Sequence, residues 1–209
     1  MMLTSQRPVV LFDLLTALLD SWSLWNAVAG GSEPGRRWRL RYLQLTYGAT
    51  GYVPYEELVR RSALDSGLDE VVAHALVERW DELAPWPEVS AVLRTLVSEG
   101  YRLGVVTNCS DVLGQQAAAR LGVPVHVVTA ERAGAYKPDA RPYQLALREL
   151  EADPSQTVFV AGSPADIGGA SAVGMPVVWH NRAGLAAPAE PVTRLGTLDE
   201  LLPFLRRGA

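Results

Sequence analysis

The chain has 209 residues, of which 48% are hydrophobic and 20% charged, and 19 basic against 23 acidic side chains give a formal net charge of −4. This is an ordinary globular composition, which excludes a disordered chain, a collagen-like repeat and a disulfide scaffold. The lone Cys109 forms no internal disulfide and no multi-cysteine zinc site. The sequence has no signal peptide or membrane span, and its one basic cluster, of Arg36, Arg37, Arg39 and Arg41, is typical of a solvated helix face. We therefore expect a cytoplasmic protein with no membrane or nucleic-acid partner.

The first predicted element is a short buried strand over 9–12, which ends at Asp13. The segment that follows has helical patterns only, separated by glycine-containing turns. These helices are predicted over 21–28, 36–47, 55–66 and 68–83. Prolines at 85 and 87 stop the last of them.

The rest of the chain alternates strands with helices of about ten residues. Strands are predicted over 103–106, 125–128, 157–161 and 177–179, and helices over 88–99, 111–121, 141–151 and 165–173. This alternation produces a parallel sheet covered on both faces. The expected fold class is therefore α/β, with a Rossmann-like parallel-sheet core.

A helical insertion directly after the first strand is expected to lie over the strand ends like a lid. We expect a core domain of residues 1–19 and 86–209 and a helical cap of residues 20–85. A separate helical domain without a catalytic role is the alternative. It is less favoured because the insertion begins beside Asp13.

Polar residues follow the predicted strands at their carboxyl ends, where ligands bind in such sheets. They are Asp13, Thr107, Asn108, Gly162 and Ser163. An aspartate can act as a nucleophile while it stays ionised, and a nearby lysine such as Lys137 favours that form. Asp166, one turn past the fourth strand, is suited to hold that lysine, to orient a water or to bind a cation.

Four segments in this order resemble the motifs of the haloacid dehalogenase superfamily, over nearly the whole chain. They are Phe12-Asp13-Leu14-Leu15, Val106-Thr107-Asn108, Tyr136-Lys137-Pro138-Asp139 and Gly162-Ser163-Pro164-Ala165-Asp166. Phosphatases of this superfamily carry a second aspartate where this chain has Leu15, which cannot transfer a proton. Gly162 stands where they have a further acid, leaving Asp13 and Asp166 as the charged ligands of an alternative Mg²⁺ site. A magnesium-dependent phosphatase is therefore the second hypothesis.

The chain resembles the (S)-2-haloacid dehalogenases more closely, in the segments 38–44, 137–143 and 179–182. The resemblance implies displacement of halide from a 2-substituted carboxylate without metal or cofactor, through an ester on Asp13, to give a 2-hydroxyacid. Asp166 would position the water that hydrolyses the ester. Other roles that the resemblance implies are halide binding by Arg39, support of Lys137 by Tyr143, and substrate contacts from Thr107, Asn108 and Ser163.

Several positions depart from this pattern. Ala17 replaces a threonine, unless Thr16 substitutes for it, and Ser163 replaces an asparagine. A third hypothesis is therefore a catalytically silent binding protein. Arg39 lies among other arginines, so an anion ligand and a solvated helix face both remain open. The resemblance implies a homodimer, and the apolar cap residues Trp22, Leu24 and Trp25 suit either a core or a dimer face.

Overall fold

The computed structural model describes residues 7–186 and 191–207. Its centre is a six-stranded sheet in the order β3-β2-β1-β4-β5-β6, in which all neighbouring strands are parallel. The strands are β1 (Val9–Asp13), β2 (Arg102–Thr107), β3 (His126–Thr129), β4 (Thr157–Ala161), β5 (Val177–His180) and β6 (Thr193–Leu195). The predicted α/β fold is confirmed. The pattern does not predict β6, whose three residues include a single apolar side chain.

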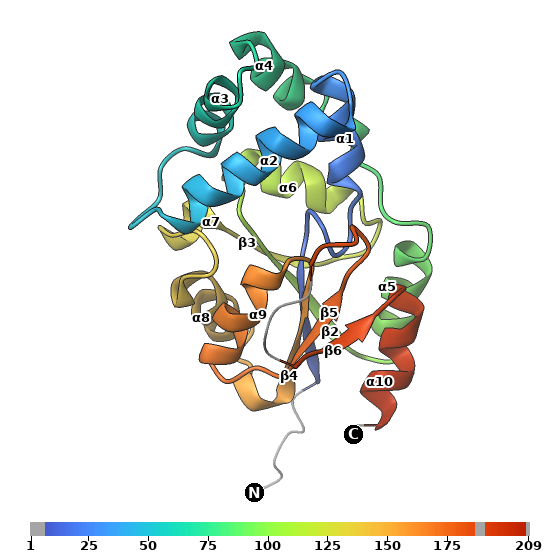
Figure 1. Cartoon of the computed structure of the whole chain (residues 1–209). Helices are drawn as coiled ribbons and strands as arrows, with labels where there is room; N and C mark the ends of the chain where they lie inside the picture. Colours follow the sequence, from blue (N-terminus) through green and yellow to red (C-terminus); the bar gives the residue numbers. More distant parts are fainter. Residues whose placement is uncertain (1–6, 187–190, 208–209) are drawn as a thin grey trace, which may run out of the picture.

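Helices cover both faces of the sheet (Figure 1). One layer consists of α8 (Ala140–Glu149) and α9 (Pro164–Ala172), and the other of α5 (Val89–Ser98), α6 (Asp111–Ala119) and α10 (Leu201–Arg207). Shorter elements are α7 (Ala130–Ala133), η2 (Pro154–Gln156) and η3 (Leu198–Glu200). The sequence pattern predicts neither α7 nor α10. Over the described residues, every helix is too short or too polar to cross a membrane.

The central strand β1 shows why both faces are covered. Val9 and Leu11 pack with residues of α8 and α9, whereas Val10 and Phe12 pack with residues of α5 and α6. Successive side chains of a strand point to opposite faces, so a parallel strand covered on both sides is apolar throughout. The run before Asp13 is therefore continuous, and the carboxylate follows where the strand leaves the core.

The inserted helices are α1 (Ser21–Val28), α2 (Ser32–Tyr47), α3 (Tyr55–Asp65), α4 (Glu70–Glu78) and the short η1 (Trp80–Glu82). They lie together at one end of the molecule (Figure 1). The chain enters and leaves this region side by side, because Leu19 forms a β-bridge with Pro85. The Trp86 N–H also donates to the Leu18 carbonyl at 3.1 Å. We propose that residues 20–85 are the cap and that residues 1–19 and 86–209 are the core.

Aromatic residues fill the interior of the cap. The rings of Trp25 and Trp38 lie 4.4 Å apart, and Tyr42 lies 5.4 Å from Trp25. Leu24 and Trp25 are both buried in this interior. The cap is also fastened to the core, since the Trp80 indole donates to the Leu113 carbonyl at 2.8 Å. These contacts place a rigid helical surface over the carboxyl ends of the strands.

Candidate active site

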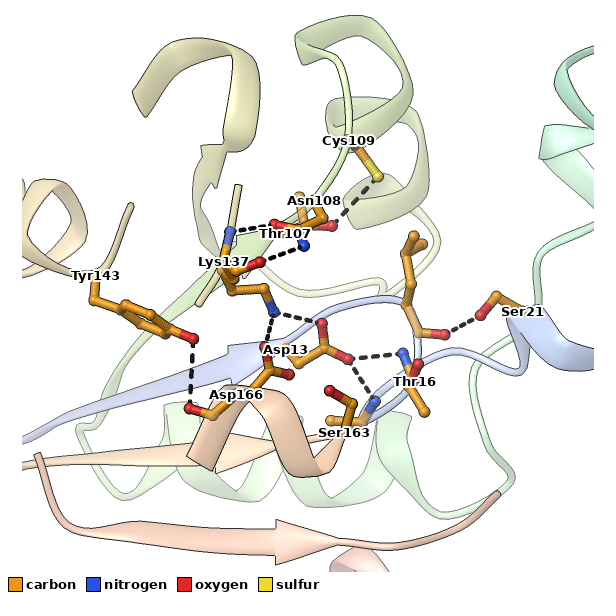
Figure 2. Close-up of polar contacts among 12 residues, drawn as sticks. Asp13, Thr16, Ser21, Thr107, Asn108, Cys109, Lys137, Tyr143, Ser163 and Asp166 are labelled. Carbon is orange, nitrogen blue, oxygen red and sulfur yellow. Dashed lines mark hydrogen bonds and ion pairs between the residues drawn. The ribbon is translucent and has the colours of Figure 1, made fainter. Parts of the chain in front are cut away.

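Three charged side chains from distant parts of the chain meet at the carboxyl ends of the central strands (Figure 2). The Lys137 Nζ lies 2.7 Å from Asp13 Oδ1 and 3.1 Å from Asp166 Oδ1. Lys137 is 2% exposed, and both carboxylates are buried. Buried charges are costly to desolvate unless they are paired. The lysine therefore compensates two carboxylates at once, as the strand-end pattern predicts.

The two carboxylates differ in acidity. Burial alone would raise the pKa of Asp13, but the Lys137 ammonium and the backbone donors of Thr16 and Ala17 bring that pKa below its ordinary value. Burial raises the pKa of Asp166 to about 6, because the attraction of Lys137 offsets only part of it and the charge of Asp13 adds to it. As the pH falls, Asp166 is the first to take a proton. Asp13 is thus suited to nucleophilic attack and Asp166 to proton transfer.

Asp13 is oriented by the backbone of the loop that follows it. Its Oδ2 accepts hydrogen bonds from Thr16 N at 2.9 Å and Ala17 N at 3.1 Å. The carbonyls of the same two residues are also held, by Trp86 Nε1–H at 3.0 Å and by the buried His180 Nδ1 at 2.7 Å. Burial lowers the pKa of His180, which favours the neutral ring, and Nδ1 must carry the hydrogen to bind a carbonyl. The loop is therefore preorganised around Asp13.

The Thr16 hydroxyl faces the cap. It accepts a hydrogen bond at 2.9 Å from Arg39 Nη2, while Asp13 is bound by the N–H groups of Thr16 and Ala17. A backbone donor needs no hydroxyl on its own side chain. The alanine at position 17 therefore leaves this support of Asp13 intact.

Arg39 differs from the arginines around it. It is 5% exposed, whereas Arg36 and Arg37 are exposed. Its Nη1 donates to Ser21 Oγ at 2.6 Å, and its guanidinium lies 4.2 Å from the centre of the Trp22 ring. Among the described residues, no carboxylate oxygen lies within 4.0 Å of it. A buried guanidinium held only by hydroxyls and an aromatic face is suited to receive an anion.

A cavity of about 40 Å³ joins these groups. The core contributes Asp13, Asn108, Lys137, Ser163 and Asp166 to its walls, so these predicted site residues come together. A larger cavity of about 390 Å³ lies elsewhere, between uncharged residues such as Tyr101 and Phe204. Size alone therefore does not identify the site, because of these two cavities only the smaller is lined by charged side chains.

Two of the predicted site residues, one a substrate contact and one a support of Lys137, lie behind the site. Thr107 is fully buried, with its Oγ1 3.3 Å from Cys109 Sγ. Tyr143 is also buried and donates at 3.4 Å to the backbone carbonyl of Asp166, not to Lys137. In the described part of the chain, neither belongs to the walls of the 40 Å³ cavity. The strand-end pattern locates such residues in the chain, but it does not determine the direction of their side chains.

Asn108 holds the backbone of Lys137. Its Oδ1 accepts from Lys137 N at 2.7 Å, and its Nδ2 donates to the Lys137 carbonyl at 3.1 Å. The amide nitrogen has two hydrogens, and this bond uses one of them. Asn108 therefore positions the lysine and retains a donor on the side of the cavity.

The cap supplies wall residues that the sequence analysis did not single out. With Arg39, they are Tyr42, Leu43 and Tyr47, all on α2. From Arg39 to Tyr47, these four residues are three, one and four positions apart, which places them on one face of a helix. This spacing is visible in the sequence, but only the packing of α2 shows that the face points toward Asp13.

The site geometry agrees with the comparisons to known proteins. Residues 17–174 match the family described as haloacid dehalogenase-like hydrolases. The chain belongs to this family of hydrolases and is an enzyme. The matched segment begins after Asp13. The interpretation of Asp13 as a nucleophile therefore depends on its motif and on the contacts described above.

Two curated relatives are (S)-2-haloacid dehalogenases. The (S)-2-haloacid dehalogenase 4A of Burkholderia cepacia is 33% identical, over 99% of this chain and 97% of that protein. The (S)-2-haloacid dehalogenase H-109 of Pseudomonas putida is 28% identical, over 92% and 96%. A crystal structure of an L-2-haloacid dehalogenase is 26% identical, with a TM-score of 0.80 over 97% of this chain and 100% of that one.

Proposed function

We propose that the protein is a 2-haloacid dehalogenase that uses an ester on Asp13 and needs neither metal nor organic cofactor. The observation that carries this proposal is the pairing, in one cavity, of an ionised carboxylate with a buried guanidinium that has no carboxylate partner among the described residues. The carboxylate of Asp13 supplies the nucleophile, and the guanidinium of Arg39 stabilises a departing anion. The cavity is small, about 40 Å³, which favours short-chain acids.

In the first step, an oxygen of Asp13 attacks C2 of the 2-haloacid from the side opposite the halogen. The new C–O bond forms as the carbon–halogen bond breaks, and the halide leaves with the bonding electrons toward Arg39. The second donor hydrogen of Asn108 is available to the substrate carboxylate. Halide needs no proton to leave, so Leu15 suffices where a phosphatase requires an acid.

In the second step, water attacks the carbonyl carbon of the Asp13 ester. Asp166 accepts a proton from the water and passes it to the departing oxygen of the 2-hydroxyacid. Lys137 and the N–H groups of Thr16 and Ala17 stabilise the negative charge that develops on the aspartyl oxygens. Asp13 is regenerated, and C2 has been inverted once.

The magnesium-dependent alternative fits these residues poorly. A Cβ on Gly162 would lie 2.4 Å from Asp13 Oδ2, so no third carboxylate can stand there without displacing the nucleophile. Asp13 and Asp166 already share the Lys137 ammonium. Over residues 7–186 and 191–207, no three His, Cys, Asp or Glu side chains gather as a metal site. Two carboxylates so occupied hold Mg²⁺ weakly.

Halide release from (S)-2-chloropropionate in EDTA tests the proposal, with Asp13→Asn as the matched variant. We expect release by the parent protein, none by the variant, and an ester adduct on Asp13 by mass spectrometry. A single turnover in ¹⁸O-labelled water should place the label in Asp13, since water attacks the aspartyl carbon. Hydrolysis of phosphate esters only with magnesium would support the phosphatase, and no adduct with any substrate would support a silent binding protein.

A further inference from the structure

Tyr47, the last residue of α2, is a cavity residue with no part in the steps described above. Its side chain lies at the rim, where 39% of the residue is exposed. Its hydroxyl reaches inward to within 3.4 Å of Ser163 Oγ. This is a hydrogen bond between cap and core, and both residues line the cavity with Asp13 and Asp166. Tyr47 therefore connects the cap to the part of the site that contains the proposed base.

The Ser163 side chain lacks the hydrogen bond that is usual at its position in the fold. It is the N-cap of α9, where a serine hydroxyl ordinarily accepts a hydrogen bond from the first turn of the helix. In the described structure the Ser163 side chain makes no such bond, and Asp166 N instead donates to the Ser163 backbone carbonyl at 3.2 Å. Figure 2 shows the hydroxyl pointing toward Asp13 and Asp166. The hydroxyl is therefore available to the site.

Tyr47 is separated along α2 from Arg39, toward which halide is expected to leave. Arg39 and Tyr47 lie on the same helix and are eight residues apart in the sequence, which corresponds to about 12 Å along the helix axis. Arg39 contacts Ser21 and Thr16, whereas Tyr47 contacts Ser163. The middle of α2, at Arg39, and its C-terminal end, at Tyr47, therefore contact different residues of the site.

We propose that Tyr47 is a positioning residue for the second step, in which its hydroxyl holds the Ser163 hydroxyl beside Asp166 so that Ser163 fixes the attacking water. This inference rests on the proposed dehalogenase function. With Tyr47 as donor, the Ser163 hydrogen binds the water oxygen, and a water hydrogen points to Asp166. The proton moves from water to Asp166 and then to the departing oxygen, and neither hydroxyl loses its own. Burial and the nearby Asp166 carboxylate raise the pKa of Tyr47 to about 12, so the phenol remains a donor at neutral pH.

Separate measurement of the two chemical steps tests the proposal. The experiment compares four proteins: the parent, Tyr47→Phe, Ser163→Ala and the double variant. Each is mixed with (S)-2-chloropropionate, and the halide and the ester are followed in a single turnover by rapid quench and mass spectrometry. Tyr101→Phe, next to the 390 Å³ cavity, is the control. We expect Tyr47→Phe to form the ester at the parental rate and to hydrolyse it about tenfold more slowly, as the loss of one hydrogen bond predicts. The double variant should be no slower than the slower single variant.

Unchanged hydrolysis of the ester in Tyr47→Phe would overturn the proposal. So would equal slowing of both steps, which is the signature of a loosened cap. If the parent protein itself releases no halide and forms no ester, the dehalogenase function fails and the positioning role fails with it. Normal turnover by the parent with normal ester hydrolysis in Tyr47→Phe overturns the positioning role alone.

Discussion

The core and cap halves of the cavity differ in whether their buried charges are paired with a counter-ion. In the core half, Asp13 and Asp166 share one ammonium at 2.7 and 3.1 Å. In the cap half, Arg39 is held by the hydroxyls of Ser21 and Thr16 and by the face of Trp22. A buried charge without a counter-ion reduces stability, whereas a paired one is compensated. The comparison indicates that the core half sets the charge of the nucleophile, while the cap half keeps a positive charge for an incoming anion.

The strongest test of this difference is Lys137→Met. It leaves two buried carboxylates facing each other, and we expect the free energy of unfolding at pH 7.5 to fall by about 3–5 kcal/mol. Ester formation should slow by roughly a thousandfold, because Asp13 loses the ion that keeps it charged. Urea unfolding and single-turnover halide release measure the two effects. Arg141→Met, which breaks an exposed pair with Asp139, is the control and should change stability by less than about 1 kcal/mol.

The cap half should respond differently. Arg39→Lys keeps the positive charge but loses the planar fork that reaches Ser21 and Thr16 together. We expect ester formation to slow about a hundredfold, with a smaller loss of stability than in Lys137→Met. Arg36→Lys, on the exposed side of the same helix, should leave both quantities unchanged. A larger loss of stability in Arg39→Lys than in Lys137→Met would contradict the comparison.

Ester formation and ester hydrolysis should depend differently on pH, because they use different carboxylates of the core half. Burial and the charge of Asp13 raise the pKa of Asp166 to about 6 in the free protein, and the ester removes the charge of Asp13. Ester hydrolysis should therefore fall about tenfold per pH unit, beginning below pH 6. The pKa of Asp13 itself is lowered. Ester formation should continue to lower pH. Single turnovers between pH 4.5 and pH 8 would then show the ester accumulating on the acidic side. Parallel pH profiles for the two steps would exclude this division of roles.

The same shift predicts how stability depends on pH. The folded pKa of Asp166, about 6, lies above its ordinary value of 3.8, so the folded protein binds this proton more tightly than the unfolded chain does. Its contribution to the free energy of unfolding is therefore complete below about pH 4 and is lost as the pH rises through 6. The difference between the parent and Asp166→Asn, followed by urea unfolding from pH 4 to pH 7, isolates this contribution. A parent protein that gained stability relative to Asp166→Asn as the pH rose would have the wrong sign.

The smallest expected effects come from two glycines of one segment. Gly162→Ala pushes a Cβ to 2.4 Å from Asp13 Oδ2, whereas a Cβ on Gly168, inside α9, meets no atom within 4 Å. We expect Gly162→Ala to destabilise the protein by about 1–3 kcal/mol and to reduce ester formation. Gly168→Ala should stabilise α9 by about 0.5–1 kcal/mol and leave turnover unchanged. Thermal unfolding and steady-state halide release measure both, and equal behaviour of the two variants would refute the steric argument.

Several features of the fold and site could be predicted from local pattern. The continuous apolar run before Asp13 indicates a buried parallel strand, and the alternation after residue 86 indicates the α/β core. Lys137 and Asp166 are recognisable because their motifs occur in order with that of Asp13. The departures at Leu15 and Gly162 also carry meaning in the sequence alone, since a leucine transfers no proton and a glycine supplies no ligand.

Other features required the assembled molecule. The sequence alone predicted five of the six strands and the helical insertion, because each of these follows from neighbours within a few turns of chain. The reactive residues were proposed from the order of the motifs along the chain. Tertiary structure decided that Arg39 is buried while Arg36 is exposed, that Thr107 and Tyr143 lie behind the cavity, and that Tyr47 meets Ser163. The physical reason is that side-chain directions are set by packing between distant segments. The cap packs on the core around Arg39 and Tyr47, whereas Thr107 and Tyr143 are placed by packing within the core. Tyr47 and Ser163 are more than a hundred residues apart in the sequence.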